Sequence, residues 1–128
     1  MESANSRTES ANSRTEPVLA VCKDLFFVAR IRETARLAGV PLKFTRTPEE
    51  LRAALGDGAR FVLIDLTGGF DYAAMFATLG EPRPPVLAFT THALAKQTQP
   101  WHAQCDRVVT KETLTAELPQ LLTQGVTA

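Results

Sequence analysis

The sequence carries no formal net charge, has few cysteines and lacks any long apolar segment. Its 128 residues include 14 Lys and Arg against 14 Asp and Glu, so nothing in the overall charge attracts the chain to phosphate backbones or anionic membranes. No apolar run approaches the roughly 20 residues that a helix needs to cross a bilayer. We therefore expect a cytoplasmic protein that contacts neither nucleic acid nor membrane.

The two cysteines, Cys22 and Cys105, are too few for a disulfide framework and lack the paired spacing of a zinc site. Cys22 ends an expected strand, whereas Cys105 precedes the last one, so the two thiols should lie at opposite ends of a sheet. We expect both to be reduced, with Cys22 packed as a small apolar side chain. No metal or cofactor is expected.

The first 16 residues are a polar duplication, because residues 3–9 read SANSRTE and residues 10–16 repeat it unchanged. A coiled-coil seam needs two large apolar positions in each heptad, and this unit offers one Ala. It cannot offset the entropy of ordering. We expect a disordered tail over residues 1–16 and one domain over residues 17–128.

From residue 17 onward, short apolar runs alternate with amphipathic segments. The expected strands are 18–22, 41–46, 61–66, 86–89 and 107–109. The expected helices are 25–38, 48–55, 72–79 and 93–102, and a short last helix holds Leu118, Leu121 and Leu122 with Pro119 in its first turn. This alternation predicts a three-layer, doubly wound α/β fold with a parallel sheet and sites at the carboxyl ends of the strands.

Several polar residues follow these strands and should converge at one edge of the sheet. They are Cys22, Lys23, Asp24, Asp65, Thr90, Thr91, His92 and Lys111. An Asp at the end of the third strand, a Thr at the end of the fourth and a Lys at the end of the fifth resemble the response-regulator receiver domain family. The resemblance spans about residues 18–122, and it implies a flavodoxin-like fold with strand order 2-1-3-4-5.

The same resemblance assigns roles to these residues. Asp65 would accept a phosphoryl group, Thr90 (or its neighbour Thr91) would report it, and Lys111 would pair with the phosphate. Each also has a structural interpretation, in which Asp65 is a hydrogen-bonded carboxylate at a strand end, the threonines cap a turn or helix and Lys111 is a surface lysine.

The sequence departs from the receiver pattern where the family holds Mg²⁺. Two acidic residues are expected after the first strand, but Cys22 and Lys23 stand there, with Asp24 one position later. Glu112, not a cis-proline, follows the lysine. Hard cations prefer oxygen ligands, so we expect a degenerate receiver in which Lys23 and Lys111 form a standing ion pair with Asp65.

The leading hypothesis is a stand-alone pseudo-receiver, a non-enzymatic signalling and protein-interaction module of two-component-type signal transduction. Its partner would be a kinase, a phosphotransfer protein, an effector or a second copy, docked on the face formed by residues 93–122. The alternative is a phosphorylatable single-domain response regulator that uses Asp24 as a Mg²⁺ ligand.

Three other classes are weaker. A flavin or nucleotide enzyme is disfavoured because the loop after the first strand has no glycine to let backbone amides approach a phosphate. A redox sensor would rest on Cys22 beside Lys23. A soft-metal site would need Cys22, Asp65 and His92 from three unrelated loops.

Overall fold

The computed structural model describes residues 15–127. The duplicated segment that the sequence predicts as a disordered tail lies outside the described residues, apart from its last two, Thr15 and Glu16. The backbone carbonyl of Glu16 accepts a hydrogen bond of 2.8 Å from the Arg60 Nε, and that of Pro17 accepts one of 2.9 Å from the Arg60 amide. The described chain is thus tied to the domain from Glu16 onward.

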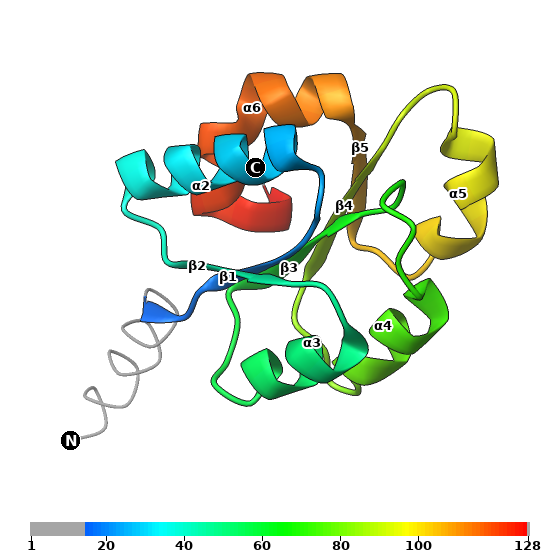
Figure 1. Ribbon diagram of the computed structural model, residues 1–128, viewed down its shortest axis with the longest axis horizontal. Helices are drawn as coiled ribbons and strands as arrows, with labels where there is room; N and C mark the ends of the chain where they lie inside the picture. The colour runs from blue at the N-terminus through cyan, green and yellow to red at the C-terminus, as the bar shows by residue number, and fades with distance from the viewer. Residues whose placement is uncertain (1–14, 128) are drawn as a thin grey trace.

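A five-stranded, all-parallel sheet forms the centre of the fold, with strand order β2-β1-β3-β4-β5 (Figure 1). Its strands are β1 (Val18–Val21), β2 (Leu42–Thr45), β3 (Phe61–Asp65), β4 (Val86–Thr90) and β5 (Arg107–Thr110). The flavodoxin-like fold and the strand order predicted from the sequence are confirmed. In this order β2 and β5 are the two edge strands.

The helices cover both faces of the sheet (Figure 1). They are α2 (Leu25–Ala38), α3 (Pro48–Leu55), α4 (Tyr72–Leu79), α5 (Ala95–His102) and α6 (Lys111–Gln124), and a short 3₁₀ helix (Gly125–Thr127) follows. α2 and α6 pack together on one face, while α3, α4 and α5 lie on the other. None of the helices within residues 15–127 is long and apolar enough to span a membrane.

The two faces of the sheet build two separate apolar cores. β1 is buried along its whole length, and its successive side chains alternate between the faces. Ala20 and Cys22 join the core under α2 and α6, whereas Leu19 and Val21 join the core under α3 and α4. A strand buried on both faces reads as an uninterrupted apolar run, which is why VLAVC was recognisable in the sequence.

The helix starts follow the capping residues that the sequence contains. Asp24, Thr47, Asp71 and Thr110 each accept hydrogen bonds from first-turn amides of α2, α3, α4 and α6. Such side chains satisfy amide donors that have no partner inside the helix. At the other end of α2, Gly39 takes φ 70°, the left-handed conformation that closes a helix. The four N-terminal caps fix where a loop at the carboxyl edge of the sheet becomes a helix.

The last helix is longer than the sequence predicts. A short helix with Pro119 in its first turn was expected, but α6 begins at Lys111 and runs for 14 residues with the proline inside it. Leu114 and Leu118, which come before the proline, are buried together with Leu121 and Leu122, which come after it. Burying this continuous stripe outweighs the cost of the hydrogen bond that proline cannot donate.

Candidate functional site

A hollow of about 230 Å³ opens at the carboxyl edge of the sheet. Three segments that are distant in the sequence line it: the β1–α2 loop, the β3–α4 loop and the start of α6. The lining residues are Lys23, Asp24, Asp65, Thr67, Gly68 and Lys111. The structure therefore brings together four of the residues singled out in the sequence, namely Lys23, Asp24, Asp65 and Lys111.

Asp65 is the only acidic residue that is buried in the described part of the chain, with 1% of its surface exposed. It ends β3, and its Oδ1 accepts hydrogen bonds from the Thr67 amide (2.8 Å) and the Thr67 hydroxyl (2.7 Å). A Cβ on Gly68 would lie 3.4 Å from the other oxygen, Oδ2. The carboxylate is thus held through Oδ1 by its own loop, and a side chain larger than that of glycine at position 68 would approach Oδ2.

Tyr72, at the start of α4, holds the β3–α4 loop through two hydrogen bonds to its backbone. Its hydroxyl donates to the Asp65 backbone carbonyl (2.6 Å) and accepts from the Gly68 amide (3.0 Å). Burial raises the pKa of Tyr72, so the phenol stays protonated and keeps donating at neutral pH. The Gly68 amide therefore donates to Tyr72 and is not available to bind an anion in the hollow.

The two lysines of the hollow rest on aromatic rings. The Lys23 Nζ lies 5.2 Å from the ring centroid of Phe70, and the Lys111 Nζ lies 5.2 Å from that of Phe27. The expected ion-paired clamp on Asp65 is wrong, since the ion pairs among residues 15–127 include none between Asp65 and either lysine. A cation over an aromatic face gains electrostatic attraction without giving up all of its water, which competes with pairing to a carboxylate whose Oδ1 already accepts two hydrogen bonds from Thr67.

Asp24 faces the hollow but serves α2. Its Oδ1 accepts from the amides of Phe26 (2.9 Å) and Phe27 (3.2 Å) and so caps the helix. The hollow as a whole holds two carboxylates and two ammonium groups. The formal charges of these four side chains sum to zero.

Cys22 directly follows β1 and is fully buried. Burial, followed by the negative charge of Asp65, raises the pKa of the Cys22 thiol to about 11. Burial likewise raises the pKa of Cys105 to about 11. Both cysteines are free, as the sequence predicts, and a neutral thiol is neither a good nucleophile nor a good metal ligand.

Thr90 points away from Asp65. Asp65 pairs in register with Phe89, and because side chains alternate along a strand, the next residue faces the opposite side of the sheet. There the buried Thr90 hydroxyl lies 3.1 Å from the Thr98 hydroxyl of α5, which in turn lies 2.8 Å from the His102 Nε2. The hydroxyl that the resemblance links to Asp65 thus belongs to a polar chain under α5.

Thr91 has a local role, since its hydroxyl accepts from the Leu94 amide (3.1 Å) and closes the turn before α5. His92 is exposed. Among residues 15–127, no three His, Cys, Asp or Glu side chains are grouped closely enough to form a metal site. Cys22, Asp65 and His92 therefore do not form the soft-metal group considered from the sequence.

Sequence reasoning missed Thr67, Phe70 and Tyr72. A signal for the first existed, because an Asp often bonds the amide two residues later in a turn, and Asp65 is followed by Leu, Thr, Gly and Gly. No spacing rule identifies a tyrosine that folds back on the loop before its helix. The two aromatic residues became part of the site through tertiary packing.

Comparisons of the chain with protein-family models, with curated proteins and with solved structures gave no significant match.

Proposed function

We propose that this protein is a pseudo-receiver: a cytoplasmic signalling module of two-component type that acts by binding other proteins and does not depend on Mg²⁺-assisted phosphorylation. The observation that carries the proposal is the charge balance of the Asp65 hollow, where two carboxylates face two lysines. The strand order, the Asp at the end of β3 and the Lys after β5 support the receiver part.

The charge balance bears directly on metal binding. Mg²⁺ is held through carboxylates and water, and it loses its hydration shell reluctantly. In the hollow, Lys23 stands at a position where the receiver pattern has a carboxylate, and the Asp24 Oδ1 is already committed to two helix amides. A cation entering here would meet two ammonium groups and gain too little from Asp65 to offset its dehydration.

Access to Asp65 points in the same direction. Transfer of a phosphoryl group needs the attacking oxygen in line with the leaving group, and a metal to neutralise the developing charge. Asp65 is almost fully buried, and Thr67 occupies Oδ1 twice. The arrangement supports a structural carboxylate that holds the β3–α4 loop in one conformation.

Two features support action by binding. Among residues 15–127, the large apolar side chains exposed to solvent are those of Leu25, Phe26 and Leu37, at 79%, 62% and 72%, and all lie on α2. The receiver resemblance also favours a second surface, the face made by α5, β5 and α6 at the β5 edge of the sheet. We propose a kinase, a phosphotransfer protein, an effector or a second copy as the partner.

The test is a titration with Mg²⁺ and then with beryllofluoride, a mimic of the phosphoryl group, followed through backbone amide NMR shifts. We expect no saturable shift at Asp65, Thr90 or Lys111 at millimolar Mg²⁺. Shifts that appear in the wild type and vanish in Asp65→Asn would overturn the proposal and establish a phosphorylatable receiver.

A variant with increased Mg²⁺ affinity shows whether local charge explains the absence of Mg²⁺ binding expected for the wild type. Lys23→Asp replaces an ammonium group with a carboxylate beside Asp65, so Mg²⁺ affinity should rise by about tenfold or more if the local charge sets it. Lys96→Asp, the same change on exposed α5, should leave the affinity unchanged. If Lys23→Asp gained no affinity, the charge argument would be wrong.

A further inference from the structure

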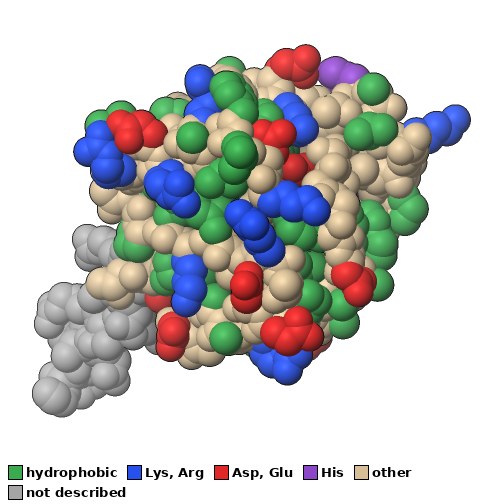
Figure 2. Space-filling view, viewed as in Figure 1, with side chains coloured by type: hydrophobic (Ala, Val, Ile, Leu, Met, Phe, Trp, Pro, Cys, Tyr) green, Lys and Arg blue, Asp and Glu red, His purple; other side chains and the backbone are tan. Residues whose placement is uncertain are grey.

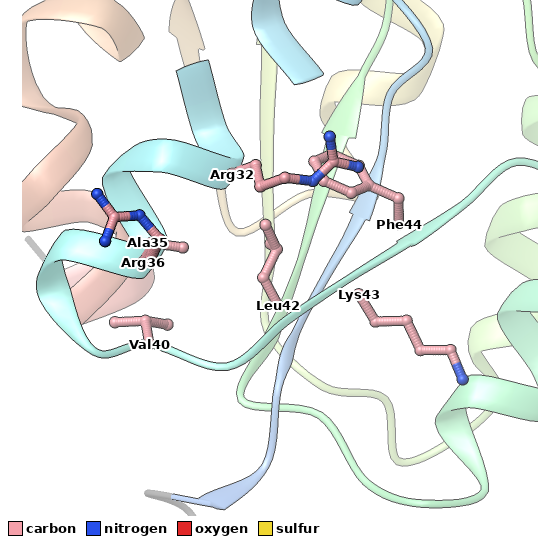
Figure 3. Close-up of a pocket in the computed structure, with 7 residues that line it drawn as sticks. All are labelled: Arg32, Ala35, Arg36, Val40, Leu42, Lys43 and Phe44. Atoms are coloured by element: carbon pink, nitrogen blue, oxygen red, sulfur yellow. The ribbon is translucent and has the colours of Figure 1, made fainter. Parts of the chain in front are cut away.

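A groove runs between α2 and the edge strand β2, away from the Asp65 hollow (Figure 3). It encloses about 460 Å³, and its lining consists of Arg32, Ala35, Arg36, Val40, Leu42, Lys43 and Phe44. Its apolar members are Ala35, Val40, Leu42 and Phe44, and its basic members are Arg32, Arg36 and Lys43. Leu42 and Phe44 reach it from alternate positions of β2.

The backbone of β2 is open on the side away from β1. β2 pairs with β1 alone, and the Val18 amide donates to the Pro41 carbonyl (2.9 Å). Alternate residues of a parallel strand bond to the same neighbour. The amides and carbonyls of Leu42 and Phe44 therefore point outward, where a further strand could pair with them.

Basic side chains flank this edge on both faces of the sheet. The Arg32 guanidinium lies 5.1 Å from the ring centroid of Phe44, on the α2 side, and Lys43 extends from the other side of the strand (Figure 3). Arg36 is paired with Glu33 at 2.6 Å. Figure 2 shows Lys and Arg side chains gathered over α2 and β2.

We propose that the free edge of β2 and its groove bind an extended, acidic peptide segment of a partner protein as an added strand. Main-chain hydrogen bonds to Leu42 and Phe44 would supply affinity, and the side chains would supply specificity. Successive residues of an added strand point to alternate faces. Acidic residues would therefore meet Arg32 on one face and Lys43 on the other, with apolar residues against the apolar members of the groove.

Other occupants fit less well. Pairing of β2 with β2 of a second copy sets basic residues against basic residues, which is unfavourable for directly opposed side chains. A nucleic acid would be attracted by Arg32, Arg36 and Lys43, although Arg36 is already paired with Glu33. It would not, however, form hydrogen bonds with the open edge of β2. The edge favours a peptide backbone, because a peptide alone matches its alternating donors and acceptors.

The experiment uses the full chain and a fluorescein-labelled ten-residue peptide of Glu and Val, arranged so that Glu falls on both faces of an extended strand. We expect saturable binding by fluorescence anisotropy, with amide NMR shifts centred on Leu42 and Phe44. Lys43→Glu should weaken binding about tenfold, while Lys96→Glu on α5 should leave it unchanged.

Two control ligands separate strand addition from general charge attraction. The same peptide with every backbone amide N-methylated cannot donate to the carbonyls of the β2 edge and should lose binding, as should the peptide with Lys in place of Glu. Equal binding of the N-methylated peptide, or tighter binding of a single-stranded oligonucleotide, would overturn the inference. Because the Asp65 hollow takes no part, Asp65→Asn should bind the peptide like the wild type, whatever the result of the Mg²⁺ titration.

Discussion

At the scale of single residues, burial decides the chemistry of the Cys22 thiol. Its pKa is raised to about 11 from an ordinary 9.0, so at pH 8 the reactive thiolate is about a hundredfold scarcer than in an ordinary cysteine. We expect iodoacetamide to alkylate Cys22 at least about a hundredfold more slowly than a small free thiol, with a rate that rises with pH. Mass spectrometry of a timed reaction measures this directly.

The raised pKa also has a consequence for stability. The folded protein holds the thiol proton more tightly than the unfolded chain does, so this contribution is fully present below pH 9 and is lost as the pH rises toward about 11. Cys22→Ala should flatten that part of the stability profile relative to the wild type. Rapid alkylation of native protein at pH 8 would instead indicate that the thiol is exposed.

The site could be predicted from the sequence only where a residue is placed by its own strand. Asp65 was recognisable because it closes an apolar run whose carboxyl end must lie at the edge of the sheet. The ion pair was predicted wrongly because lysine side chains are long, and nothing local shows that Phe70 and Phe27 receive them.

At the scale of elements, capping residues and buried runs were readable because both are local signals. Thr47, Pro48 and Glu50 mark the start of α3. The length of α6 could not be predicted, because the expectation that a helix does not continue through a proline takes no account of tertiary packing. In the fold, burial of Leu114 and Leu118 against α2 and the sheet decides the outcome.

Pro119 tests this account. It is exposed in the middle of α6, so Pro119→Ala removes no packing and restores an amide donor to the helix. We expect the free energy of unfolding to rise by about 1 to 2 kcal/mol, less than the roughly 3 kcal/mol that an interior proline costs, because proline also restricts the unfolded chain. Urea unfolding followed by circular dichroism measures the change.

Gln120→Ala, at the next exposed position, provides the comparison and should change stability by a few tenths of a kcal/mol. A loss of stability in Pro119→Ala would mean that the proline contributes to the packing or the bend of α6 in a way that its exposure conceals.

At the scale of the whole molecule, the buried apolar residues found in the structure lie between Val18 and Leu122. The duplicated unit offers a single Ala for burial, so deletion of residues 1–14 should leave the free energy of unfolding within about 0.5 kcal/mol of that of the full chain. Deletion of residues 1–17 removes the Glu16 and Pro17 carbonyls that accept from Arg60 and should cost about 1 to 2 kcal/mol.

Thermal and urea unfolding of the two truncated chains, made side by side, measure the difference. Marked destabilisation by the shorter deletion would mean that the duplicated segment contributes to the domain.

The order of strands in the sheet also sets the order in which the protein can be completed during synthesis. β1 is made first, yet it lies between β2 and β3, and β3 ends at Asp65. Until the ribosome has released about half of the chain, one side of the apolar VLAV strand has no partner and can pair with a strand of another nascent chain. Slow translation between α2 and β3 would therefore prolong the interval in which the growing polypeptide needs protection from aggregation.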